Sequence, residues 1–418
     1  MSRVAQHARL AARGMRRQRG AVAVIVAIVL AVLIGFVGLA LDLGKLYVTR
    51  SELQNSADAC ALAAARDLTG ATVNLSVSEA AGITAGHQNF ALFQQNAVQL
   101  NTDSNVTFSD ALTNPFLPKG SVSKPSAIKY VKCTTAQGNI ANWFIQALNV
   151  IPGINIAKAA VSATAVATVG PSQTTCAIPV FVCKAGTAVS PPVAGATYNI
   201  GDWMSSKTGS PPSYGAGNFG WAALDGSNSA SEITKELAGN YCNLPAVGSS
   251  IGSPGNKISS GDAWNTRFGV YHNPFKGPAD GTPDFTGYSY TSGTWGAGRD
   301  AYADFVAKRQ TFASYQGDTL SGISTGGSYS AGNYTGGADR RLVLAPEVDC
   351  TQLLSGHSAS VLQWDCVLML DPMASGGGAG PVHLEYRGSS SMAGSPCATE
   401  GVPGNSNSVG PMVPVLLQ

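Results

Sequence analysis

Charged residues are scarce in this sequence: they make up 12% of the chain, and none before position 42 is acidic. The eight cysteines form no CxxC pair, and no His/Cys cluster has zinc spacing. Six arginines before residue 20 exceed the formal net charge of +2, so the remainder of the chain is net acidic. The basic character therefore belongs to the N-terminus, and we expect no nucleic-acid partner.

One long apolar run is present, the 21 uncharged residues from Ala21 to Leu41. It is long enough to cross the roughly 30 Å hydrocarbon core of a bilayer as a helix. Arginine is the only type of charged residue that precedes the run, so the positive-inside rule places residues 1–20 in the cytoplasm and the chain after Leu41 outside. A cleaved signal peptide is the alternative, since Gly38-Leu39-Ala40 has small residues at both cleavage-type positions. A signal peptide has an apolar core of only about 7–15 residues, so the length favours a retained anchor.

The helical pattern continues through residues 42–68, which contain no proline, with Gly70 as the expected stop. We expect the apolar stripe of this extension to pack on its own domain; packing on another subunit is the alternative. That stripe consists of Leu43, Leu46, Tyr47, Leu53, Ala57, Cys60, Ala61, Ala64 and Leu68. Within the membrane run, small residues every four positions predict a helix-packing face, formed by Ala23, Ala27, Ala31 and Gly35.

A motif spans the junction between the run and its extension. It comprises Arg19-Gly20, Asp42, Gly44, Tyr47, Leu53-Gln54 and the string Ala57-Asp58-Ala59-Cys60-Ala61-Leu62-Ala63. In order and spacing these residues resemble the N-terminal segment of TadG-like (TadE/TadG) proteins of Flp pilus assembly. Cys60 stands where that family usually has alanine. Processed pilins carry a glutamate five residues after the cleavage glycine, and Ile25 stands there in this chain, so the resemblance favours an unprocessed anchor.

The resemblance implies a non-enzymatic structural component of Flp (tight-adherence) pilus assembly or an allied surface-export system. It implies a single-pass protein of the bacterial inner membrane with a periplasmic bulk and no cofactor. The implied partners are pilins, pseudopilins or other pilus assembly proteins. It also implies a pilin-like module, in which a sheet holds the helical stripe.

Residues 69–170 are expected to form that small α+β module. We predict a helix from Ser78 to about Ala97, a short amphipathic helix over Asn142–Leu148, and three strands. The strands are expected at Val106–Phe108, Ile128–Cys133 and Val161–Val169.

Gly170-Pro171 marks an expected boundary, followed by a β-rich, Cys-containing domain over residues 171–372. Its strand-like runs are CAIPVFVC, NFGWAAL, RLVLAPEVDC and VLQWDCVLML, and the polar segments Ser250–Ser260 and Ser321–Ala338 are expected to be loops. Residues 373–418 look weakly ordered except near Val382–Tyr386 and the apolar end. The chain as a whole is therefore predicted to be α+β.

An even set of scattered cysteines in an exported chain indicates disulfides. Cys176 and Cys183 flank a predicted strand, and at seven residues apart they point to opposite faces, so each should bond to another partner. The disulfide candidates are Cys133, Cys176, Cys183, Cys242, Cys350 and Cys366.

Two motifs raise alternative functions. Asp225, Ser227 and Ser229 fit the DxSxS metal loop of von Willebrand A-type adhesins, although a turn that caps a helix is the favoured interpretation. Ser324 lies in a GxSxG string, which would make the protein a membrane-tethered serine hydrolase, but glycine and serine flank it where a nucleophile elbow needs a strand and a helix.

The histidines are interpreted as surface or loop residues, because none stands at ligand spacing from another histidine, a cysteine or a carboxylate. They are His7, His87, His272, His357 and His383. The dense aromatic residues of the C-terminal half are interpreted as its core, with partner or glycan binding as the alternative.

Overall fold

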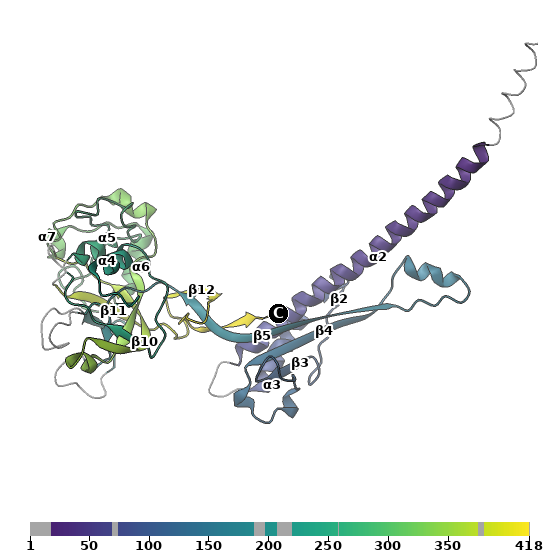
Figure 1. Ribbon diagram of the computed structural model, residues 1–418, viewed down its shortest axis with the longest axis horizontal. Helices are drawn as coiled ribbons and strands as arrows, with labels where there is room; N and C mark the ends of the chain where they lie inside the picture. The colour runs from purple at the N-terminus through teal and green to yellow at the C-terminus, as the bar shows by residue number, and fades with distance from the viewer. Residues whose placement is uncertain are drawn as a thin grey trace, which may run out of the picture. The chain divides into compact units, whose positions relative to one another are not determined.

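The computed structural model describes residues 18–68, 74–187, 197–206, 220–257, 259–374 and 380–417. The chain divides into two compact units, unit 1 with residues 1–169 and 414–418, and unit 2 with residues 170–413. Mixed helices and sheets make the fold α+β, as predicted. Figure 1 labels the elements.

Helix α2 (Gln18–Arg66) is a single α-helix of 49 residues, about 74 Å long at 1.5 Å per residue. It contains both the apolar run and its extension, so the predicted continuity is confirmed. The expected stop at Gly70 lies outside the described residues. The turn that follows the helix is closed by Leu68, whose N–H donates to Ala65.

An antiparallel sheet packs against the second half of α2. Its neighbours run in the order β12-β5-β4-β3, and β13 also pairs with β5. The strands in unit 1 are β3 (Val106–Ser109), β4 (Tyr130–Ile140) and most of β5 (Ala159–Thr174). β12 (Ala398–Pro403) belongs to unit 2 and pairs with the end of β5 that lies there, and β13 is Met412–Leu416. Smaller elements of unit 1 are α3 (Leu75–His87), the ladder β1 (Phe90–Ala91) with β2 (Asn96–Ala97), and three 3₁₀ turns, η1 (Lys119–Ser121), η2 (Pro125–Ala127) and η3 (Ile145–Val150).

Two helix predictions in unit 1 were wrong. The helix expected from Ser78 to Ala97 begins at Leu75, because Asn74 accepts hydrogen bonds from the N–H groups of Ser76 and Val77, and it ends at His87. Ser78 lies inside the helix and donates to the carbonyl of Ala64 on α2, 2.7 Å away. The second prediction, Asn142–Leu148, corresponds to the 3₁₀ turn η3, which starts three residues later.

The core of unit 1 confirms that the α2 stripe packs on its own domain. Ala57, Cys60, Ala61 and Ala64 are fully buried against α3 and the sheet. Small residues allow this close approach, because a Cβ at Gly82 of α3 would lie 3.0 Å from Ala64. The packing predicted for the N-terminal end of the stripe was wrong, since Leu43 and Tyr47 are exposed.

Unit 2 is built around a mostly antiparallel sheet in the order β6-β9-β10-β11-β7, with β8 also paired to β10. Among the described strands of this sheet, β6 is the one that runs parallel to its neighbour. The strands are β6 (Val182–Cys183), β7 (Trp203–Ser206), β8 (Ser250–Gly252), β9 (Leu342–Val348), β10 (Ser358–Met369) and β11 (Val382–Ser389). Its helices are α4 (Ala230–Ala238), α5 (Ser260–Thr266), α6 (Tyr302–Gln310) and α7 (Asp318–Ser321), with 3₁₀ turns η4 (Ala331–Gly336) and η5 (Cys350–Leu354).

Several predictions for unit 2 need correction. The runs RLVLAPEVDC and VLQWDCVLML are strands, whereas CAIPVFVC and the described end of NFGWAAL contribute mainly isolated bridges. The segment expected as a loop at Ser250–Ser260 begins with β8. The order expected near Val382–Tyr386 and at the apolar end is confirmed, since these residues lie in β11 and β13. The weak order expected between them was wrong, because Ala398–Pro403 forms β12. Predicted core aromatics such as Trp221, Trp264 and Tyr290 are fully buried.

All eight cysteines are paired, which confirms the predicted disulfides. Cys60, omitted from the candidate set, joins α2 to Cys133 on β4, and Cys397, also omitted, joins Cys366 on β10. Cys176 and Cys183 bond to other partners as predicted, namely Cys242 and Cys350.

Candidate functional site

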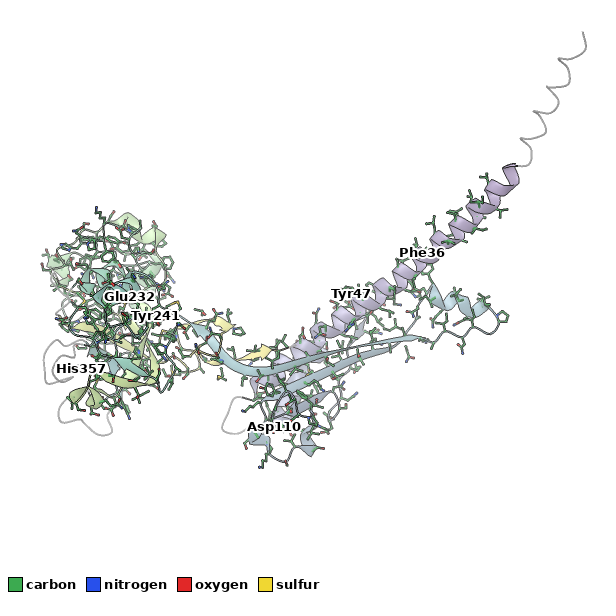
Figure 2. All side chains as sticks on the ribbon, in the orientation of Figure 1. Phe36, Tyr47, Asp110, Glu232, Tyr241 and His357 are labelled. Atoms are coloured by element: carbon green, nitrogen blue, oxygen red, sulfur yellow. A yellow bond between two sulfur atoms is a disulfide. The ribbon has the colours of Figure 1, made fainter. Side chains whose placement is uncertain are left out.

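The first half of α2 is an apolar, exposed helix. Its large side chains range from 40% exposed at Leu39 to 67% at Phe36, and Phe36 is labelled in Figure 2. Within the described part of the chain, this is the one helix long and apolar enough to cross a membrane. Ala27, Ala31 and Gly35 are exposed on it, and the helix-packing face they were predicted to form stays a prediction.

The C-terminal end of this candidate span contacts a segment about 100 residues away in the sequence. The β4–β5 hairpin ends in residues 141–157, which we call the hairpin tip. Asp42, the first charged residue after the run, accepts hydrogen bonds from the N–H groups of Phe144 and Ile145, at 3.0 and 2.8 Å. These N–H groups begin η3, and a carboxylate at the N-terminus of a helical turn is favourable.

Two further contacts fix the tip to α2. Lys45 donates to the carbonyl of Ala141 at 2.9 Å, and its Nζ lies 4.3 Å from the centroid of the Trp143 ring. Gly38 lets the tip approach closely, because a Cβ there would lie 2.7 Å from Phe144. Sequence reasoning missed this contact, although the run from 141 to 157 is uncharged and contains Trp143 and Phe144.

Further along α2, motif residues bind the sheet. The amide of Gln54 donates to Asp58 at 2.7 Å and to the carbonyl of Thr164 on β5 at 3.0 Å. Thr135 of β4 donates to the carbonyl of Leu53 at 2.9 Å. These bonds and the Cys60–Cys133 disulfide make the C-terminal half of α2 an integral part of unit 1.

Not every motif residue has such a contact. A Cβ at Gly44 would meet no atom within 4 Å, and Tyr47 is 76% exposed (Figure 2). Arg19 and Gly20 precede the side chains that the structure describes. Packing within the described chain therefore leaves the conspicuous aromatic ring of Tyr47 unexplained.

The DxSxS string forms a capping turn, as the favoured interpretation predicted. Asp225 accepts from the N–H of Ser227 at 2.7 Å, and Ser229 accepts from the N–H of Glu232 at 3.1 Å, which caps α4. Across the described residues, no three His, Cys, Asp or Glu side chains gather as a metal-binding group.

Ser324 does not lie on a nucleophile elbow. The short helix α7 precedes it, Gly322 adopts a left-handed conformation with φ of 70°, and no strand leads into the turn. The neighbouring Ser321 Oγ lies 2.8 Å from the hydroxyl of Tyr315 and 3.1 Å from the carbonyl of Gly317, which gives it a structural role in the loop.

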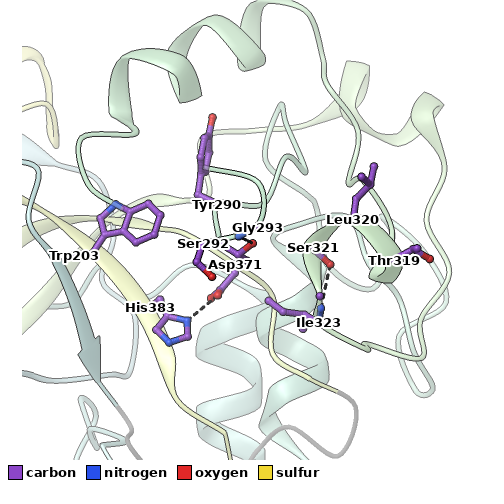
Figure 3. Close-up of a pocket in the computed structure, with 12 residues that line it drawn as sticks. Trp203, Tyr290, Ser292, Gly293, Thr319, Leu320, Ser321, Ile323, Asp371 and His383 are labelled. Atoms are coloured by element: carbon purple, nitrogen blue, oxygen red, sulfur yellow. Dashed lines mark hydrogen bonds and ion pairs between the residues drawn. The ribbon is translucent and has the colours of Figure 1, made fainter. Parts of the chain in front are cut away.

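A pocket of about 540 Å³ opens in unit 2 (Figure 3). His383 of β11 and Asp371 line one side, and Ser321 and Ile323 line the opposite side. His383 lies on a strand and not in a loop, its side chain is 41% exposed, and its Nδ1 lies 2.7 Å from the buried carboxylate of Asp371. This hydrogen bond raises the pKa of His383 above its ordinary value.

No hydroxyl or thiol of the described chain is hydrogen-bonded to the His383 ring, so a nucleophile–base pair is not formed. A second histidine, His272, lies 3.5 Å from Asp262, again outside any cluster of metal-ligand type.

The fold and the site together describe a protein with one candidate membrane-spanning helix and two compact units. One helix with an apolar first half continues without a break into an α+β unit, and a β-rich unit with three disulfides of its own follows in the sequence.

One comparison with known proteins matches the N-terminal helix. Residues 20–67 match the family model described as "Putative Flp pilus-assembly TadE/G-like". The resemblance drawn from the motif residues is thus confirmed for this segment, and it supports involvement in Flp/Tad pilus assembly. No curated protein and no solved structure matches the chain.

Proposed function

We propose that this protein is a membrane-anchored, non-enzymatic structural component of Flp (tight-adherence) pilus assembly or allied surface-export machinery. In this proposal α2 is a retained single-pass anchor in the bacterial inner membrane. Residues 1–20 are cytoplasmic, and units 1 and 2 lie in the periplasm. The family match over residues 20–67 is the observation that carries the proposal.

The orientation rests on charge. The charged residues before the span are all arginines, and Asp42 is the first acidic residue after it. This distribution is the one expected for a cytoplasmic N-terminus. The disulfides of both units are compatible with an oxidising periplasm.

We further propose that the exposed side of α2 just beyond the span binds pilins, pseudopilins or other assembly proteins. Leu43 and Tyr47 are one helical turn apart, and both are exposed. Because the buried side of this helix already packs on unit 1, the exposed side is the one available to a partner helix.

Photo-crosslinking in cells that produce the pilus tests this role. A benzophenone amino acid is placed at Tyr47 and, as the matched control, at Val77, which is 50% exposed on α3. The proposal predicts a covalent adduct with a pilus assembly protein from position 47 and none from position 77. Equal adduct patterns at both positions, or no adduct at position 47, would contradict the proposed contact.

A further inference from the structure

The hairpin tip exposes an unusual amount of apolar surface. Val150 is 87% exposed and Trp143 is 66% exposed, and the whole segment from 141 to 157 carries no charge. Other large apolar side chains of the tip are also exposed, namely Phe144, Leu148, Ile151 and Ile154. A contiguous patch of this kind marks a contact with a partner or a membrane.

The position of the tip identifies what covers it. Its contacts with Gly38, Asp42 and Lys45 place it at the outer end of the candidate span, where apolar residues give way to the first charged ones. Figure 1 shows the β4–β5 hairpin extending along α2 to this level. In a bilayer this level is the boundary between the hydrocarbon core and the headgroups.

The chemistry of the tip also suits that boundary. Tryptophan prefers the interface. Lys158 directly follows the uncharged segment, and Lys45 of α2 donates to Ala141 at its start, so both amines lie beside the tip, where they can reach the headgroups. Some backbone polar groups of the tip are hydrogen-bonded within it. The Asn149 side chain accepts from the N–H of Ile156 at 2.6 Å and donates to the carbonyl of Ile156 at 3.1 Å. These internal hydrogen bonds lower the free-energy cost of transferring the tip from water to the membrane.

We propose that the hairpin tip inserts into the outer leaflet and forms a second, interfacial membrane contact beside α2. The occupant of the patch is lipid and not a second copy of the chain, because the patch is continuous with the candidate span. The inference rests on the proposed membrane anchoring of α2. Its consequence is that unit 1 is held to the membrane at two places, so the depth of the anchor and the tilt of the unit are coupled.

The test uses the full chain reconstituted in vesicles of phosphatidylethanolamine and phosphatidylglycerol. An environment-sensitive fluorophore on a genetically encoded residue replaces Val150 in the tip, Val29 in the span, or Leu112, an exposed apolar residue of unit 1 outside the tip. Spin-labelled lipids then quench any fluorophore that lies in the bilayer. We expect blue-shifted, quenched emission at positions 150 and 29, and unquenched emission at position 112.

The outcomes separate the two proposals. Quenching at 29 without quenching at 150 overturns the tip insertion and leaves the anchor intact. Absence of quenching at 29 overturns the anchor and the insertion together. A blue shift at 150 without quenching indicates burial against protein, which also overturns lipid insertion. As a further check, V150D/I151D should abolish the quenching of a fluorophore at Leu148 while that at Val29 persists.

Discussion

Glu236 is a carboxyl group in an unfavourable place. It lies buried on α4, and burial, with smaller effects from Asp225 and Glu232, raises its pKa from 4.5 to about 8. The folded protein therefore keeps a proton that the unfolded chain releases above pH 4.5. Stability supplied by this group is complete below the unfolded pKa and is lost as pH rises through the folded one.

We predict that Glu236→Gln makes unit 2 more stable at pH 8 and reduces its loss of stability between pH 5 and 8. The expected gain at pH 8 is about 1 kcal/mol, because partial solvent access weakens the effect. Urea unfolding at several pH values measures it. Glu232→Gln is the matched control, since this more exposed glutamate pairs with Lys235 on the surface, and it should change stability little. An identical pH profile for wild type and Glu236→Gln would show that Glu236 ionises normally.

The motif residues of α2 also differ at the scale of single side chains. Asp42, Gln54 and Asp58 are hydrogen-bonded in ways that build unit 1, whereas Tyr47 is left exposed. The sequence motif alone could not separate these roles. The N–H groups that Asp42 binds lie 102 and 103 residues further along the chain, beyond the reach of any local pattern.

Among the elements, α2 is joined covalently to the sheet of its own unit. The Cys60–Cys133 disulfide joins the helix to β4 across a sequence separation of 73 residues. A link across so long a loop stabilises the folded unit mainly by restricting the unfolded chain.

We predict that C60A/C133A destabilises unit 1 by about 2–4 kcal/mol without preventing folding, because the surrounding alanine packing remains. Faster amide hydrogen exchange in β4 and in the C-terminal half of α2 would report this loss. The matched control is C366A/C397A, which removes a disulfide of unit 2 and should leave exchange in unit 1 unchanged. Unchanged exchange in unit 1 of C60A/C133A would contradict the prediction.

Elements with a strong periodic pattern could be predicted from the sequence, and elements set by distant contacts could not. The apolar run and the alanine stripe predict α2, and the β-branched runs predict β9 and β10. The end of α3 escaped prediction. Leu92, Phe93 and Gln94 adopt left-handed conformations just beyond it, held by Glu52 of α2, which accepts from the N–H groups of Phe93 and Gln94.

In the candidate site, too, the features set by local sequence could be predicted and those set by distant contacts could not. Composition and length predict the span from Ala21 to Leu41. The hairpin tip could not be placed beside the span, because nothing local connects residues 141–157 to Gly38 or Asp42. Likewise, the pairing of His383 with Asp371 depends on a strand ladder and not on spacing in the sequence.

At the scale of the whole molecule, one helix joins two functions. Its first half is suited to lipid, and its second half is part of the core of unit 1. In our account, the chain thereby couples a membrane position to a folded periplasmic surface. Everything proposed for the pilus machinery depends on the helix staying whole, since a cut between its halves would release both units.

Protease treatment of intact spheroplasts, followed by mass spectrometry of the carbonate-washed membranes, tests this claim most directly. We predict that protease digests or trims units 1 and 2 from outside, and that the membrane retains a protected fragment containing residues 1–20 joined to Ala21–Leu41. Complete protection of the chain would contradict the orientation. A soluble product that begins after Ala40, with no fragment left in the membrane, would contradict the anchor itself.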